Sequence, residues 1–326
     1  MQEREVKQVQ IMPSAVHVMF DPTGTRLAVS SGLDPNVHVV ELDTGKTIAT
    51  LPHPEGVGET SWHPDGVQLA TPCGDLRVRI WDVPSRSVRL TLEGHTSVPN
   101  AVKFNHAGDL LVSCGWDGTT RFWDPVRGKE LFSLPEGWVG LSTFNSDDSL
   151  LPFGLYQSGL GLWQIATGRE CRRLGLGGPT FHATFSAEGR VLVTCHDDGA
   201  RLWDLVTGRL CAVLPAQECR CVLFHPDGRS LVLSGHMGLQ LWPLQTSEDS
   251  TTLTWRIGPP QTLLSIPLEQ ARWQPDGQAL VAAGPHGVRV LELGPPLQTR
   301  HHWQHPNAAG LALSGDGNWI ASGNWK

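Results

Sequence analysis

The chain has 326 residues, of which 40% are hydrophobic and 17% charged, with a formal net charge of −7 at pH 7. This composition can fill a buried core, and the scattered cationic residues argue against binding to a nucleic-acid backbone. No apolar run of about 18 residues is present, and the polar N-terminus lacks an apolar signal core, so we expect no membrane interaction. The seven cysteines are odd in number and fall in strand-like runs, which favours free thiols and a cytoplasmic location.

One sequence motif recurs along the chain: an aromatic residue, three further residues, a glycine and then an apolar run. The fourth copy has Asp148 in place of the glycine, and the eighth copy is weaker. The first residues of the copies lie 42, 42, 40, 41, 39, 49 and 40 residues apart. Such even spacing predicts a structural repeat of about 40 residues. These anchor residues are Phe20, Trp62, Phe104, Phe144, Phe185, Phe224, Trp273 and Leu313.

Each repeat divides into four strand-like pieces. A turn such as 64–66 suits the first hairpin, because its glycine tolerates a positive φ. An apolar run such as 110–113 and an alternating strand such as 78–81 follow, and a further turn leads to the last strand. Four antiparallel strands repeated around a ring describe a β-propeller blade. The 49-residue interval predicts an insertion of about eight residues near 246–252, as a polar surface loop.

Three dipeptides, at 81–82, 123–124 and 203–204, resemble the Trp-Asp pair of WD40 repeats, and Gly94-His95 resembles their Gly-His pair. The resemblance extends over essentially the whole chain. It implies an all-β fold, a WD40-type β-propeller with four antiparallel strands per blade. We expect seven blades over residues 1–304 and an incomplete eighth repeat over residues 305–326; eight blades are the alternative. Residues 6–11 are a candidate for an outer strand that closes the ring. Because the eighth repeat stops before its third strand, we expect the chain to be a piece of a longer array.

The resemblance also implies a hydrogen-bonded set of four side chains, a tetrad, within a blade. The second and third repeats carry the required residues at the same four offsets from their anchor glycines. We expect these two blades to be the most rigid in hydrogen exchange, because the tryptophans of the next three repeats lack the histidine and need another acceptor. The predicted tetrads are His53, Thr71, Asp75 and Trp81 in repeat 2, and His95, Ser113, Asp117 and Trp123 in repeat 3.

The sequence contains no nucleophile elbow, no phosphate-binding loop and no kinase catalytic-loop signature. His301, His302 and His305 stand among strands rather than on a helix, and Cys219 and Cys221 lack a second pair of ligands. We therefore predict that the chain is not an enzyme and has no catalytic residue, metal site or cofactor.

Aromatic and histidine side chains recur at the turn between the second and third strands of the repeats. In a propeller these turns gather on one face around the central channel, where rigid rings favour binding at low entropic cost. The alternative is that they only cover their own turns. The predicted partner-binding residues are Trp116, Tyr156, His196, His236, His286 and Trp325, with Trp138 in a neighbouring loop.

The predicted function is a non-catalytic interaction scaffold for protein or peptide partners, without nucleic acid or membrane. A second candidate is a regulatory or sensor module cut from a larger multidomain enzyme, such as a bacterial protein kinase. A third, a propeller hydrolase or quinoprotein, would need convergent acidic ligands or adjacent cysteine pairs, which the sequence does not show.

Overall fold

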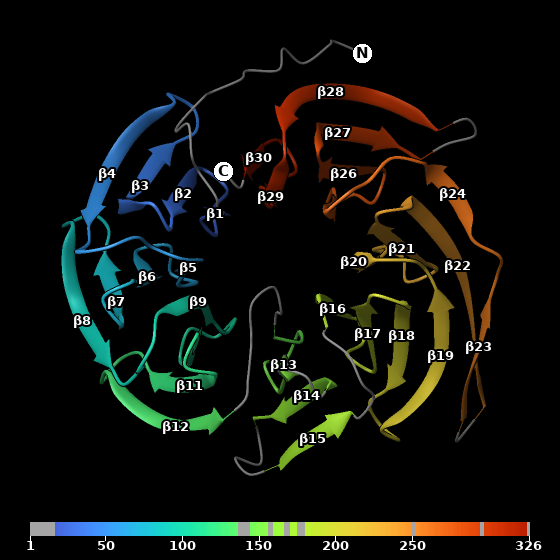
Figure 1. The fold of residues 1–326 in the computed structure, drawn as a ribbon, viewed down its shortest axis with the longest axis horizontal. Coiled ribbons are helices and arrows are strands. Elements are labelled where there is room, and N and C mark those ends of the chain that lie inside the picture. The colour runs from blue at the N-terminus through green and yellow to red at the C-terminus, as the bar shows by residue number, and fades with distance from the viewer. Residues whose placement is uncertain are drawn as a thin grey trace.

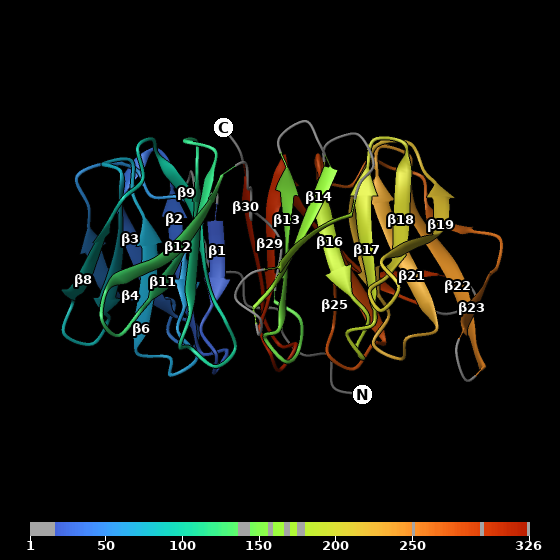
Figure 2. The same ribbon diagram turned by 90° about the horizontal axis from the view of Figure 1, so that it is seen from below.

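The computed structural model describes residues 17–135, 144–155, 159–165, 170–174, 180–249, 252–293 and 297–324. Within these ranges every regular element is a β-strand, and the strands form antiparallel sheets arranged radially around one axis (Figure 1). Figure 2, turned by 90°, shows the blades standing side by side in a single layer. The predicted all-β propeller fold is thus confirmed. Residues 6–11, the candidate closing strand, lie outside the described ranges.

The first three sheets are complete blades, and their strands follow the chain from the axis outward (Figure 1). The first contains β1 (His17–Phe20), β2 (Arg26–Ser31), β3 (Asp34–Glu41) and β4 (Lys46–Pro52). The second contains β5 (Ser61–Trp62), β6 (Gln68–Pro72), β7 (Arg77–Asp82) and β8 (Ser87–Glu93). The third contains β9 (Pro99–Phe104), β10 (Leu111–Gly115), β11 (Thr119–Asp124) and β12 (Lys129–Pro135).

The next sheets continue the same order. The fourth has three described strands, β13 (Leu150–Leu155), β14 (Gly159–Gln164) and β15 (Glu170–Leu174). The fifth has β16 (His182–Phe185), β17 (Val191–His196), β18 (Gly199–Asp204) and β19 (Arg209–Pro215). The seventh has β25 (Gln270–Trp273), β26 (Ala279–Gly284), β27 (His286–Glu292) and β28 (Gln298–Pro306), and the eighth has β29 (Ala308–Leu313) and β30 (Ile320–Asn324).

The sixth sheet contains the insertion, and the prediction of a surface loop there is wrong. Its strands are β20 (Cys219–Phe224), β21 (Ser230–Gly235), β22 (Gly238–Asp249), β23 (Thr252–Ile257) and β24 (Gln261–Leu264). The first part of β22 pairs with β24, and its extension pairs with β23 from Leu244 to Asp249. The inserted residues therefore lengthen a hairpin, because alternating residues such as Leu253 and Trp255 suit an extended strand.

Buried side chains join each sheet to the next and close the ring. The described residues form eight apolar clusters, and each cluster draws residues from two consecutive sheets. The last one joins Leu27 and Val29 of the first sheet to Ala321 of the eighth. The two strands β29 and β30 thus occupy an eighth position in the ring, between the seventh and first sheets (Figure 1). This position matches the eight-blade alternative, with two described strands in the last blade.

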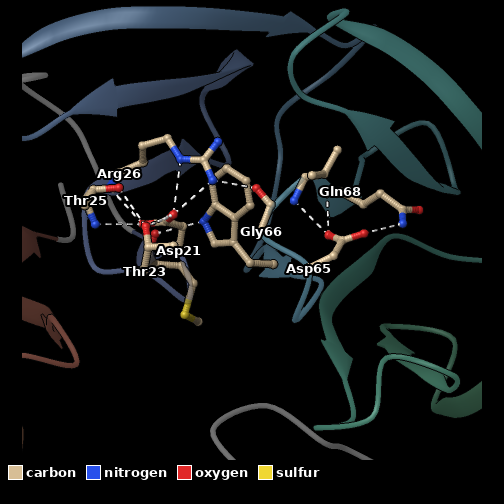
Figure 3. Close-up of polar contacts among 10 residues, drawn as sticks. Asp21, Thr23, Thr25, Arg26, Asp65, Gly66 and Gln68 are labelled. Atoms are coloured by element: carbon tan, nitrogen blue, oxygen red, sulfur yellow. Dashed lines mark hydrogen bonds and ion pairs between the residues drawn. The ribbon is translucent and has the colours of Figure 1, made fainter.

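The first hairpin turns of neighbouring blades also contact one another, on one face of the disc. Arg26 of the first blade donates a hydrogen bond to the carbonyl oxygen of Gly66 in the second, at 2.5 Å (Figure 3). The Asp21 carboxylate holds this guanidinium in place at 2.9 Å. His63 and His225 bond in the same way to the anchor-glycine carbonyls of the following blades, both at 3.0 Å. These contacts fix blade spacing on this face and leave the opposite face to carry the turns between second and third strands.

Candidate interaction face

The tetrad of the third blade is complete. His95 lies between two partners, with Nδ1 2.9 Å from the Asp117 carboxylate and Nε2 2.7 Å from the Ser113 hydroxyl. The indole N–H of Trp123 donates to the same hydroxyl at 2.8 Å. Burial would raise the pKa of Asp117, but hydrogen bonds from the backbone N–H groups of Thr119 and Thr96 and from His95 lower it to about 2. The carboxylate therefore stays ionised and anchors the loop before β9 to the β10–β11 turn.

The second blade keeps only three of its four predicted tetrad members. His53 Nε2 lies 2.8 Å from the Thr71 hydroxyl, and the Trp81 indole N–H lies 3.1 Å from both of them. The prediction that Asp75 joins them is wrong. Asp75 forms an ion pair with Arg79, whose hydrogen bonds lower the pKa of the carboxyl to about 2.

A cross-strand neighbour explains the difference between the two blades. In the third blade Arg121, the counterpart of Arg79, pairs with Glu130 at 2.6 Å and leaves Asp117 to His95. Glu130 faces Trp123 in the β11–β12 register, whereas the matching position beside Trp81 is Val88. The only glutamate of β8, Glu93, pairs with Arg77, so Arg79 pairs with Asp75.

The tryptophans of blades 4–6, for which no tetrad histidine was predicted, differ in the acceptor of the indole N–H. Trp203 donates to Thr194 at 3.1 Å, and Trp242 donates to Gln240 at 3.3 Å. The indole N–H of Trp163 is buried and has no hydrogen-bond partner among the described residues. Among the described residues only blade 3 has all four tetrad members connected, and the greater rigidity of blades 2 and 3 in hydrogen exchange stays a prediction.

The predicted placement of His196 on the binding face is wrong. Its side chain is 3% exposed, and its Nε2 lies 2.9 Å from the Thr194 hydroxyl that also serves Trp203. The hairpin between Thr194 and Trp203 is one residue shorter than the one between Ser113 and Trp123, and it turns tightly at His196 and Gly199. This shortening draws His196 into the position that the tetrad histidine fills in other blades.

Three of the predicted partner-binding residues lie exposed at the expected turns. Trp116 is 64% exposed in the β10–β11 turn, and His236 and His286 are exposed at the β21–β22 and β26–β27 turns. The remaining three, Trp138, Tyr156 and Trp325, lie outside the described residues.

The same face carries exposed apolar side chains that the sequence analysis did not select. Leu33 in the β2–β3 turn is 76% exposed, and Leu76 in the β6–β7 turn is 39% exposed. Val98, before β9, is also exposed, and its carbonyl oxygen accepts a hydrogen bond from the Trp116 backbone N–H at 2.9 Å. Leu33 and Leu76 stand one and two positions later in their turns than Trp116, and Val98 lies in a different loop, so the fixed offset of Trp116 does not include them. We call the set Leu33, Leu76, Val98 and Trp116 the apolar arc.

The loop between β4 and β5, which contains residues 56–59, connects the turns that carry Leu33 and Leu76. Its Val57 N–H bonds to the Ser31 carbonyl of the first blade at 3.0 Å, and its Gly56 carbonyl accepts from Gly74 at 2.9 Å. Further along, Glu59 N–H bonds to the Asn100 carbonyl of the third blade at 2.9 Å. The loop therefore holds the Leu33 and Leu76 turns on either side of it and ties both to the start of β9. A surface fixed in this way loses little entropy when it binds.

Leu76 adopts a backbone conformation that leucine avoids. Its φ is +71°, whereas the third blade has Gly118 at the same offset, with φ +75°. A left-handed conformation costs a non-glycine residue on the order of 1–2 kcal/mol, and such strain concentrates at functional sites. Leu76 is both strained and exposed, so we select it as the first residue of the arc to test for binding.

The described residues lack the features of a metal site, a disulfide and a membrane-spanning helix. No group of three or more His, Cys, Asp or Glu side chains that could hold a metal ion occurs in it. The six described cysteines are free. Among the same residues, no helix has the length and apolar character needed to cross a membrane.

A ring of repeated antiparallel sheets around one axis defines a β-propeller. Comparison with family models agrees: residues 45–82 and 86–124 match the family described as "WD domain, G-beta repeat". Residues 45–82 and 86–124 are thus similar to WD40 repeats.

Three relatives illustrate the similarity. COMPASS component SWD3 of Saccharomyces cerevisiae is 27% identical over 158 residues, which cover 48% of this chain and 50% of that protein. Small ribosomal subunit protein RACK1y of Oryza sativa subsp. japonica is 34% identical over 95 residues, covering 27% and 28%. Pre-mRNA-processing factor 19 of Mus musculus is 26% identical over 159 residues, covering 47% and 32%. The chain thus matches half or less of the length of each relative.

Proposed function

We infer that this protein is a non-catalytic scaffold that binds protein partners through the apolar arc on the face of blades 1–3. The observation that carries this inference is the arc itself: four exposed apolar side chains in turns and loops that backbone hydrogen bonds connect to one another. Exposed apolar patches on soluble domains commonly mark interaction sites, and tryptophan is enriched among residues that dominate binding energy.

The relatives support the scaffold on general grounds. By name, one is a component of COMPASS, one is a small ribosomal subunit protein and one is a pre-mRNA-processing factor. Membership of such assemblies fits a rigid domain that holds other proteins. The alternative of a module cut from a bacterial protein kinase receives no support from these relatives. A cytoplasmic location is part of the proposal, and the free cysteines favour it.

The test compares two variants in quantitative capture from cell extract. One carries Leu76→Gly and Trp116→Ala; the control carries Val126→Ala and Val206→Ala, two exposed residues in turns on the opposite face. We expect the arc variant to lose a set of captured proteins that the control retains. For a purified member of that set, affinity is expected to fall at least about 30-fold, the effect of losing roughly 2 kcal/mol. Equal capture by both variants would contradict the proposal.

Leu76→Gly alone separates binding from folding. Because glycine adopts φ +71° without strain, the free energy of unfolding is expected to stay unchanged or to rise by up to about 1 kcal/mol. A loss of partner affinity in this variant therefore reports a lost contact and not a damaged fold. Denaturant unfolding provides the measurement.

A further inference from the structure

Two cysteine thiols meet at the boundary between blades 5 and 6. Cys195 stands near the end of β17, and Cys219 is the first residue of β20, which contacts β17. Both side chains belong to the apolar cluster that joins these two blades, and the residues are 0% and 1% exposed. The two thiols share a hydrogen bond. Neighbouring backbone groups fix this approach, because the Glu218 N–H donates to the Asp197 carbonyl oxygen at 2.8 Å.

A bulge in β20 directs Cys219 toward the fifth blade. Residues two apart on a regular strand lie on the same face of the sheet. In β20, however, the register shifts between Cys219 and Cys221. Cys219 belongs to the cluster between blades 5 and 6, whereas the Cys221 sulfur lies 3.8 Å from the Ala271 carbonyl oxygen of the seventh blade. Cys219 thus faces Cys195, and Cys221 serves as a matched cysteine on the other face of the same strand.

The sixth blade lacks a hydroxyl that the third and fifth blades use to hold their tryptophans. Leu233 stands two residues after the cross-strand partner of the blade's tryptophan, where the third blade has Ser113 and the fifth has Thr194. The Trp242 indole N–H donates instead to Gln240 on its own strand, at 3.3 Å. Fewer hydrogen-bonded connections between strands lower the free energy of local opening. We therefore expect the boundary to open transiently and expose both thiols.

The closed boundary protects the cysteine pair. Burial raises the pKa of the Cys195 thiol, and the neighbouring Cys219 thiol raises it further. The thiolate is the reactive form of cysteine, so Cys195 does not react while the boundary is closed. Oxidation of the pair therefore depends on opening of the boundary.

We propose that Cys195 and Cys219 form a redox-sensitive lock, in which hydrogen peroxide oxidises the two thiols to a disulfide that joins blades 5 and 6. In the opened state one thiolate sulfur attacks a peroxide oxygen, and the O–O bond breaks to give a sulfenic acid and hydroxide. The hydroxide takes up the proton of that thiol and becomes water. The second sulfur attacks the sulfenic sulfur, the S–O bond breaks, and the hydroxyl group leaves as water with the second thiol proton. The electrons that the sulfurs lose reduce the peroxide to water.

The experiment exposes the chain to hydrogen peroxide in a background with Cys171→Ser and Cys211→Ser, because the exposed Cys211 can form disulfides between chains. We expect the intact mass to fall by two hydrogens and peptide mapping to locate the disulfide between Cys195 and Cys219. The melting temperature is expected to rise by about 5 °C, because the cross-link constrains the unfolded chain. Dithiothreitol is expected to reverse both changes.

Alanine variants in the same background test the pairing. Cys195→Ala and Cys219→Ala are each expected to lose the disulfide and the rise in melting temperature, whereas Cys221→Ala is expected to retain both. Urea below the unfolding midpoint is expected to speed formation of the disulfide, because it favours the opened state. The peptide map of the background chain needs no change at either cysteine, so it decides the outcome even if an alanine variant does not fold.

Three results would overturn the lock. The first is oxidation of the thiols to sulfinic acid without a disulfide, with or without urea. The second is a disulfide that joins Cys195 to Cys221 in place of Cys219. The third is a Cys195–Cys219 disulfide that leaves the melting temperature unchanged or lowers it.

Discussion

Gly56→Ala is expected to lower the free energy of unfolding by about 3 kcal/mol, the upper end of the usual cost of overpacking a folded structure. A Cβ at this position would lie 1.8 Å from the Gly32 carbonyl oxygen and 2.4 Å from the carbonyl carbon, both backbone atoms. Relief requires separating the first and second blades. The loop cannot move away freely, because hydrogen bonds tie Gly56 to Gly74 and Val57 to Ser31.

Gly32→Ala is the matched control, since it alters the other side of the same contact. A Cβ on Gly32 meets no atom within 4 Å, and its φ does not lie in the left-handed region. Its free energy of unfolding is expected to change by less than about 1 kcal/mol. Denaturant unfolding of both variants measures the difference. Similar stabilities would show that the two blades do not meet at this loop.

Stability is expected to fall as the pH drops from about 6.5 to about 4, by about 3 kcal/mol from His53 alone. The Leu51 carbonyl can only accept a hydrogen bond, so His53 Nδ1, 2.9 Å away, carries the proton. Nε2 is then the acceptor that faces Thr71 and Trp81. Burial lowers the pKa of His53 to about 4. Since the folded-state pKa lies below the unfolded value of 6.5, His53 contributes stability above pH 6.5 that is lost as the pH falls toward 4.

His53→Gln isolates this contribution from the other buried histidines. The difference in free energy of unfolding between the wild-type chain and His53→Gln is expected to shrink by about 3 kcal/mol between pH 7 and pH 4. Denaturant unfolding at several pH values provides the curve. A difference that stays constant across this range would mean that His53 is protonated as readily in the folded chain as in the unfolded one.

The sequence predicted the repeat and the tetrad of blade 3 well, because both depend on spacing along the chain. Asp75 was misassigned because its partner depends on whether a glutamate or Val88 faces Trp81 across the sheet. Offsets within one repeat do not contain that register. His196 was misassigned because a hairpin one residue shorter turns the side chain inward. Both residues stand at the predicted position of the repeat. Contacts with Arg79 for Asp75 and with Thr194 for His196 determine where their side chains lie.

The apolar arc depends on exposure, which a fixed offset does not describe. Leu33 and Leu76 look like ordinary core leucines in the sequence, yet both stand in turns. The sequence did contain a signal for these residues. Turns usually contain glycine or a polar residue, whereas Leu33 and Leu76 stand in turns between second and third strands. Leucine at these positions departs from turn chemistry, and departures of this kind often mark functional sites.

The most direct test of the scaffold account is a structure of the chain bound to a purified partner whose capture depends on the arc. Partner side chains are expected to cover Leu76 and Trp116 on the face of blades 1–3. A partner seated only on the opposite face, over the turns that contain Val126 and Val206, would contradict it.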